Sequence, residues 1–100
     1  MQSNYNADKA LGYRQFTAGS IDTAKLLSLI PGGIPAGACM ALIQCEEQAV
    51  RWRDDGVAPT TSVGYPLPAG GELAYTSGSF PRLQFISQTA GAVLNVAFYG

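Results

Sequence analysis

The sequence predicts an all-β fold, a small antiparallel β-sandwich or barrel preceded by an extended N-terminal arm. Three observations lead to this prediction. Short apolar runs alternate with a period of two residues, and clusters of Gly, Pro and Asp interrupt them about every ten residues. No segment has the periodicity of an amphipathic helix. We therefore divide the chain into an arm, residues 1–22, and one domain, residues 23–100.

The first 22 residues are polar and show no clear strand or helix period. Three aromatic residues are spaced along them, Tyr5, Tyr13 and Phe16. We expect an arm that is ordered by a neighbouring molecule, with these aromatic residues as candidate contacts. The alternative is a terminus that packs on its own domain or frays.

The first half of the domain contains three candidate strands. Residues 24–29 form one, ended by the turn residues 31–33. Residues 39–45 are apolar on both faces, as in a strand that is covered on each side. Residues 49–53 alternate cleanly and end at Asp54-Asp55-Gly56, a turn in which the glycine can take positive φ.

The second half predicts further short strands separated by loops. Residues 57–63 and 65–71 are rich in Pro, Gly and Thr and predict connections, the first leading into a short extended stretch. The predicted strands of this half are residues 72–75, 82–86 and 93–99. Six to eight short strands of this kind favour a jelly-roll-like sandwich or a small barrel.

The last two predicted strands have a shared apolar pattern. Leu83 and Phe85 can face Leu94, Val96 and Phe98 if residues 89–92 close a hairpin between the strands. We therefore expect these two strands to pair with each other.

Charged residues are few, 13% of the chain, while 47% of the residues are hydrophobic and the net charge is −1. This combination serves the solubility of a lone monomer poorly. We expect other protein to cover much of the surface, either copies of the chain or a larger partner, because interfaces are depleted in charge. The alternative is a monomer with an uncharged, Ser/Thr-rich exterior. Scattered basic residues disfavour nucleic acid.

One long uncharged stretch, residues 26–45, has the length of a membrane span. Its central prolines and glycines would break a helix, so we predict no membrane segment. The polar N-terminus predicts synthesis in the cytoplasm without a signal peptide. Cys39 and Cys45 would lie too far apart on one strand for a disulfide, which favours free thiols, although a hairpin could join them.

The residue types needed for catalysis are missing or badly spaced. The chain has no histidine, and two cysteines alone do not supply a zinc site. The carboxylate pairs Glu46-Glu47 and Asp54-Asp55 are sequence neighbours, which suits solvated turns rather than a glycosidase site. Asp54 and Asp55 could bind calcium with loop carbonyls, but turn chemistry explains them. We predict no enzyme, no cofactor and no metal site.

The most distinctive local sequence is Arg51-Trp52-Arg53. Tryptophan and arginine dominate many interfaces, and the same residues can form a platform for a sugar or a base. We favour Trp52 in the core, with Arg51 and Arg53 pairing with nearby carboxylates inside or between subunits. The candidate interface residues here are Arg51, Arg53, Asp54, Asp55 and Tyr65.

A resemblance becomes visible over residues 41–99. Those residues are similar to a group of small structural proteins of tailed bacteriophages. The residues that carry the resemblance are Ala41-Leu42-Ile43-Gln44, Gln48-Ala49-Val50-Arg51-Trp52-Arg53-Asp54-Asp55-Gly56, Ala58-Pro59-Thr60, Ser62-Val63-Gly64, Leu67, Arg82-Leu83-Gln84-Phe85-Ile86, Thr89-Ala90-Gly91-Ala92 and Leu94-Asn95-Val96. Cys45 and Gly70-Gly71 depart from the pattern. The resemblance implies a virion component and no catalytic residues.

Three functions follow as hypotheses. The first is a capsid decoration or cement protein on the outer shell, which binds the major capsid protein and copies of itself. The second is a collar, tail or fibre-base component of the virion. The third is a carbohydrate-binding module that uses Trp52, Tyr65 or Tyr75 as a stacking platform.

Overall fold

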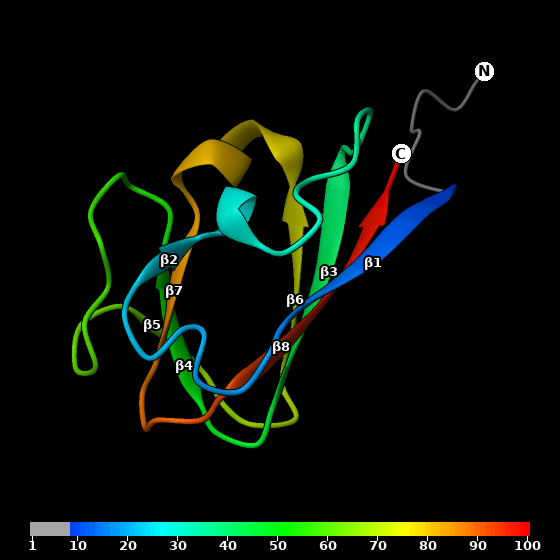
Figure 1. The fold of residues 1–100 in the computed structure, drawn as a ribbon. Helices are drawn as coiled ribbons and strands as arrows, with labels where there is room; N and C mark the ends of the chain where they lie inside the picture. Colours follow the sequence, from blue (N-terminus) through cyan, green and yellow to red (C-terminus); the bar gives the residue numbers. More distant parts are fainter. Residues whose placement is uncertain (1–8) are drawn as a thin grey trace.

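The computed structural model describes residues 9–100 and confirms an all-β chain of two four-stranded antiparallel sheets (Figure 1). The first sheet has the spatial order β1 (Ala10–Phe16), β8 (Val93–Tyr99), β3 (Met40–Glu46), β6 (Glu72–Thr76). The second has the order β2 (Lys25–Leu26), β7 (Gln84–Ser87), β4 (Val50–Arg53), β5 (Tyr65–Leu67). Two short 3-10 helices, η1 (Leu27–Leu29) and η2 (Ser77–Arg82), complete the described elements.

The strands pair as a jelly roll. The chain forms nested antiparallel pairs, the outermost β1 with β8, then β2 with β7, β3 with β6 and β4 with β5. The pairs β3–β8 and β4–β7 then complete the two sheets. An eight-stranded double sheet of this kind is the jelly-roll solution to stacking antiparallel strands. The predicted jelly-roll-like sandwich is confirmed.

The core lies between the sheets and is built from strand alternation. Strand β8 shows it most clearly, because every second residue is buried while those between are half-buried. Strand β3 follows the same pattern toward its inner face. The largest completely buried side chains are Phe16, Phe85, Phe98, Ile21, Leu27, Ile30, Ile43, Leu83, Leu94, Val50, Val96 and Cys45. Close packing of this layer fixes the two sheets on each other.

Over its described part, the N-terminal segment packs on its own domain, which is the alternative that the sequence left open, and it does not form an extended arm. Residues 10–16 form β1, which runs along β8 from the Ala10–Tyr99 pair to the Phe16–Leu94 pair. Ile21, further along the same segment, is completely buried. Residues 10–22 are therefore part of the sandwich and are held by its own strands. The remainder of the predicted arm, residues 1–8, lies outside the described residues.

The hairpin predicted between the last two strands is also wrong. β7 pairs with β2 and β4, whereas β8 pairs with β1 and β3. The connection between them crosses from one sheet to the other (Figure 1). Leu83 and Phe85 nevertheless share the core with Leu94, Val96 and Phe98, as their apolar pattern predicts. These residues belong to the core between the two sheets, and strands β7 and β8 are not joined by backbone hydrogen bonds.

Smaller differences follow from local chemistry. The strand predicted at residues 24–29 is only two residues long before η1 begins, and η2 occupies the start of the strand predicted at 82–86. β5 lies inside a segment predicted as a turn, because Pro66 is acceptable in an edge strand, where one side of the backbone needs no partner. Cys39 and Cys45 are both free, as predicted.

Removing a core side chain tests the sandwich. Phe98 is completely buried and meets Phe80 edge to face, with ring centroids 5.9 Å apart. Phe98→Ala should lower the free energy of unfolding by about 3–5 kcal/mol in a denaturant titration, because it leaves a cavity. The control is Leu29→Ala, since Leu29 is 61% exposed and its loss should cost no more than about 0.5 kcal/mol. Equal effects of the two changes would contradict this packing.

Candidate functional site

Arginine side chains hold the loops of this domain. Arg14 donates from Nε to the carbonyl of Gly33, 3.0 Å away, and so fixes the loop after η1. Arg51 donates from Nε to the carbonyl of Thr61 at 3.2 Å and from Nη1 to that of Gly64 at 2.8 Å. Through these bonds to backbone oxygens, both guanidinium groups act inside the chain.

A third such contact closes the turn after β4. Arg82, at the end of η2, donates from Nη2 to the carbonyl of Asp55 at 2.8 Å. Gly56 follows with φ +87°, the positive value that the sequence predicted for this turn. The turn is thus tied to the end of η2 by a bond between residues that are 27 positions apart in the sequence.

Arg53 and Asp55 form the ion pair that the sequence predicted near this turn. Both Nε and Nη2 of Arg53 donate to the Asp55 carboxylate, a bidentate arrangement. The hydrogen bond from Arg53 is the main reason why the pKa of Asp55 falls from 3.8 to about 2, and it also raises the pKa of Arg53. Asp55 Oδ1 accepts a further bond from the Val57 backbone N–H. Arg53 is half-buried and Asp55 is exposed, and the bonds between them order the turn.

Three aromatic side chains meet at one edge of the sandwich, where β5 and β6 are the edge strands of the two sheets. We call Trp52, Tyr65 and Tyr75 the edge aromatic cluster. The Trp52 and Tyr65 ring centroids are 4.9 Å apart at an interplanar angle of 32°, and Trp52 meets Tyr75 edge to face at 5.7 Å. Trp52 and Tyr75 are half-buried and pack on the core, whereas Tyr65 is 63% exposed.

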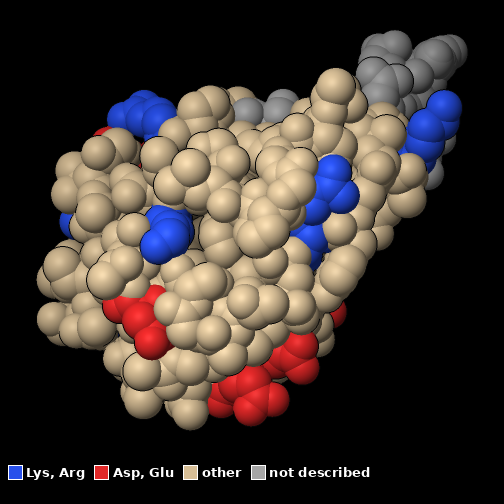
Figure 2. Space-filling view, in the orientation of Figure 1, with Lys and Arg blue, Asp and Glu red and all other residues tan. Residues whose placement is uncertain are grey.

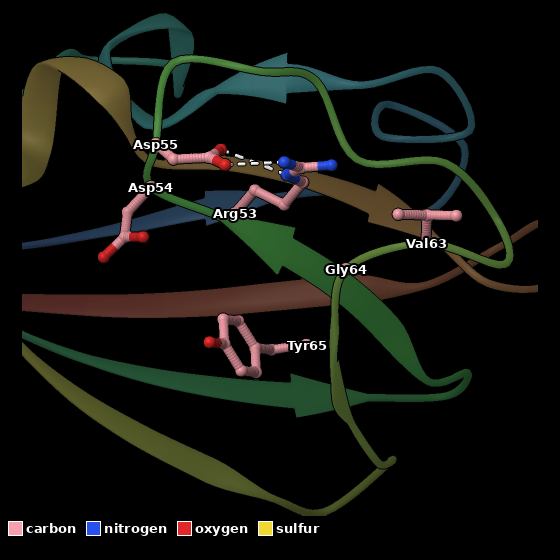
Figure 3. A pocket seen from close by; sticks show the side chains of 6 residues that line it. All are labelled: Arg53, Asp54, Asp55, Val63, Gly64 and Tyr65. Carbon is pink, nitrogen blue, oxygen red and sulfur yellow. Dashed lines mark hydrogen bonds and ion pairs between the residues drawn. The ribbon is translucent and has the colours of Figure 1, made fainter.

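An open depression of about 420 Å³ lies beside this cluster. Its lining residues come from the end of β4, the following turn and the start of β5 (Figure 3), and they are Arg53, Asp54, Asp55, Val63, Gly64 and Tyr65. Gly64 has φ +137°, and a Cβ there would meet the Trp52 carbonyl oxygen at 3.1 Å. A glycine is therefore needed for the chain to pass this close to β4 and present Tyr65.

The outer face of the first sheet carries a ladder of polar side chains across three strands. Asn95 Oδ1 accepts bonds from the Tyr13 hydroxyl and from Gln15 Nε2, and Asn95 Nδ2 donates to Glu46 Oε1 at 2.7 Å and to Gln44 Oε1 at 3.4 Å. A smaller hollow of about 210 Å³ adjoins this ladder and is lined partly by Leu42 and Ala97. The ladder uses all the hydrogen-bonding positions of the Asn95 amide, so it serves to join the strands.

The candidate interface residues that the sequence predicted do not all lie on one surface of the structure. Arg53, Asp54, Asp55 and Tyr65 come together around one depression. Arg51 neighbours them on β4 but is bound to the loop carbonyls rather than to the predicted carboxylate.

Two aromatic candidates of the predicted arm, Tyr13 and Phe16, lie within the described residues, and of these two only Tyr13 is exposed. Tyr13 is 59% exposed on the outer face of the first sheet. Phe16 is 1% exposed, so its prediction as a contact residue is wrong: it ends β1 on the inner face and fills the core. Tyr5 lies outside the described residues.

Sequence reasoning missed several residues of these surfaces. Val57 and Val63 are each 51% exposed on the loop between β4 and β5, and only the absence of an inward alternation at these positions could have indicated this. The loop contacts of Arg14 and Arg82 could not be predicted from the neighbouring sequence. Their carbonyl partners belong to loops that are distant in the sequence.

The exterior carries few charges, and in the view of Figure 2 uncharged residues cover most of the surface between scattered basic and acidic groups. No family model, curated protein or solved structure shows a significant match to this chain. Within residues 9–100, no helix is long and apolar enough to span a membrane.

Removing the hydrogen bonds of Arg51 to the Thr61 and Gly64 carbonyls should make the loop before β5 more mobile. Arg51→Gln is expected to raise the exchange rates of the loop amides at residues 60–64 about tenfold, because two hydrogen bonds to a charged donor are lost. Hydrogen exchange measured by NMR reports this residue by residue. The control is Lys25→Gln, which removes a charge of the same sign without disturbing this loop. Unchanged exchange in Arg51→Gln would contradict these contacts.

The Arg53–Asp55 pair predicts a particular pH dependence. Because the folded-state pKa of Asp55 is lowered, its contribution to stability is complete above pH 4 and is lost as the pH falls from about 4 toward about 2. An NMR titration of the Asp55 side-chain carbon should therefore show a midpoint near 2. In Arg53→Gln the midpoint should return toward 3.8. If the wild-type protein titrated with a midpoint at 3.8, the Arg53–Asp55 ion pair would not exist in solution.

Proposed function

We propose that this chain is a structural protein of a bacteriophage virion, a capsid decoration or cement protein that binds the outer shell and copies of itself. The observation that supports this proposal best is the exterior. Four of the six basic side chains are bound within the chain, Arg14, Arg51 and Arg82 to backbone carbonyls and Arg53 to Asp55. The surface is thus poor in mobile charge and suited to contact with protein.

The fold is compatible with this role, since jelly rolls occur in viral capsid domains. This argument is an analogy at the level of fold, because lectins share the architecture and fold alone does not fix function. The proposal also rests on the resemblance to small phage structural proteins that we infer from the sequence of residues 41–99.

A cement protein needs at least two contact surfaces, one for each body that it bridges. Exposed apolar side chains occur at separate places on the sandwich. Val57, Val63 and Tyr65 lie on the β4–β5 segment, Tyr13 lies on the outer face of the first sheet, and Leu29 lies in η1. Each of these contacts would be weak alone, and many copies that bind one another and the same shell would together bind it strongly.

The position in the particle can be measured by copy number. Particles should be purified from cells that produce this chain, and the chain should be quantified against the major shell protein by mass spectrometry with isotope-labelled peptides. A shell-wide cement predicts hundreds of copies per particle. A count of tens or fewer would reject that role and favour a ring in the neck or tail. The control is washing at high salt, which removes adsorbed protein. Absence of the chain from washed particles would reject the virion role altogether.

A further inference from the structure

We propose that the depression beside the edge aromatic cluster binds a neutral pyranose sugar, with Tyr65 as the stacking platform. This inference goes beyond the virion role and stands independently of it. It rests on one juxtaposition: a mostly exposed aromatic ring, held by a second ring, lies next to a carboxylate and a guanidinium group in one hollow.

The Tyr65 ring is both exposed and fixed in position. Trp52 lies against it at a centroid distance of 4.9 Å, and Tyr75 supports Trp52 from the other sheet. The backbone on either side is restricted, by the close approach of Gly64 to β4 and by Pro66. An aromatic face that is already in place loses little conformational freedom when a ligand stacks on it.

The polar groups around the ring suit hydroxyl groups. In Figure 3 the Asp54 carboxylate points away from the Arg53–Asp55 pair, toward the same side of the depression as the Tyr65 hydroxyl. Within the described residues, no protein group donates a hydrogen bond to the Asp54 carboxylate, and Nη1 of Arg53 has no acceptor. A pyranose offers an apolar C–H face for the ring and hydroxyls that can both donate and accept.

The charges around the depression select against other ligands. Two carboxylates, Asp54 and Asp55, line it with one arginine, whose charge is already paired. A phosphate or an acidic sugar would therefore be repelled. Among the described residues, there is no group of three or more His, Cys, Asp or Glu side chains that could hold a metal ion. Its volume of about 420 Å³ falls in the range of small-molecule sites, about 300–1,000 Å³.

The test uses methyl hexopyranosides as probes, those of glucose, galactose, mannose and N-acetylglucosamine. Binding to the whole chain is followed by saturation-transfer NMR and by the fluorescence of Trp52, the single tryptophan of the sequence. We expect dissociation constants in the millimolar range for at least one probe, as for any small, efficient ligand in an open site. Methyl sialoside, which is acidic, should bind more weakly.

Two variants locate the site. Tyr65→Ala should weaken binding about tenfold or more because the stacking face is lost, and Asp54→Ala should weaken it while the ring remains. The matched control is Tyr13→Ala, which removes an equally exposed tyrosine, 59% against 63%, from a different face. Denaturant midpoints of all variants verify folding.

The outcomes separate the alternatives. Loss of sugar binding in Tyr65→Ala and Asp54→Ala, but not in Tyr13→Ala, supports the site. Absence of binding by the wild-type chain to every probe overturns it, as does an equal loss in Tyr13→Ala. If the wild-type chain binds no sugar and Tyr65→Ala no longer attaches to particles, the cluster is a protein contact. The copy-number measurement is unaffected by either result, so the two proposals can fail separately.

Discussion

The apolar layer between the two sheets is the interaction on which the rest of the structure depends. β3 and β8 in the first sheet and β4 and β7 in the second supply most of its buried strand residues. Their alternation fixes which side chains face outward, and the polar ladder around Asn95 follows from it. Tyr65 instead shares a face of β5 with the buried Leu67 and is exposed at the edge of its sheet. A one-residue slip in any of these strands would exchange core and surface.

Loops in this sandwich are ordered by cation-to-carbonyl contacts as much as by turn residues. Arg14, Arg51 and Arg82 each reach a backbone oxygen of a segment distant in sequence or folded back on itself. Carbonyls in irregular loops lack ladder partners, and a guanidinium group satisfies them with strong, charge-assisted bonds. The depression beside Tyr65 has a defined shape because its rim is held in this way.

Sequence reasoning succeeded where side-chain alternation is strong and failed where pairing is non-local. β3, β4, β6 and β8 could be predicted because their inward positions are apolar. β1 could not, since its inner face carries Gly12 and Arg14 before Phe16, a pattern with only one core residue. The hairpin prediction failed because a jelly roll pairs strands that are distant in the chain. In the site, the turn and the ion pair were local and predictable, but the meeting of Trp52 with Tyr75 required both sheets.

The internal binding of most basic side chains has a consequence for how this exterior responds to its surroundings. Dissolved salt weakens attractions between solvated ions, with a screening length of about 10 Å at 0.1 M, but leaves the burial of apolar and neutral polar area largely intact. A guanidinium group that is bonded to neutral carbonyls keeps its charge but is held in place, so it is less free to form an ion pair with another molecule. If this surface binds other protein, as we propose, the affinity should therefore change little with ionic strength.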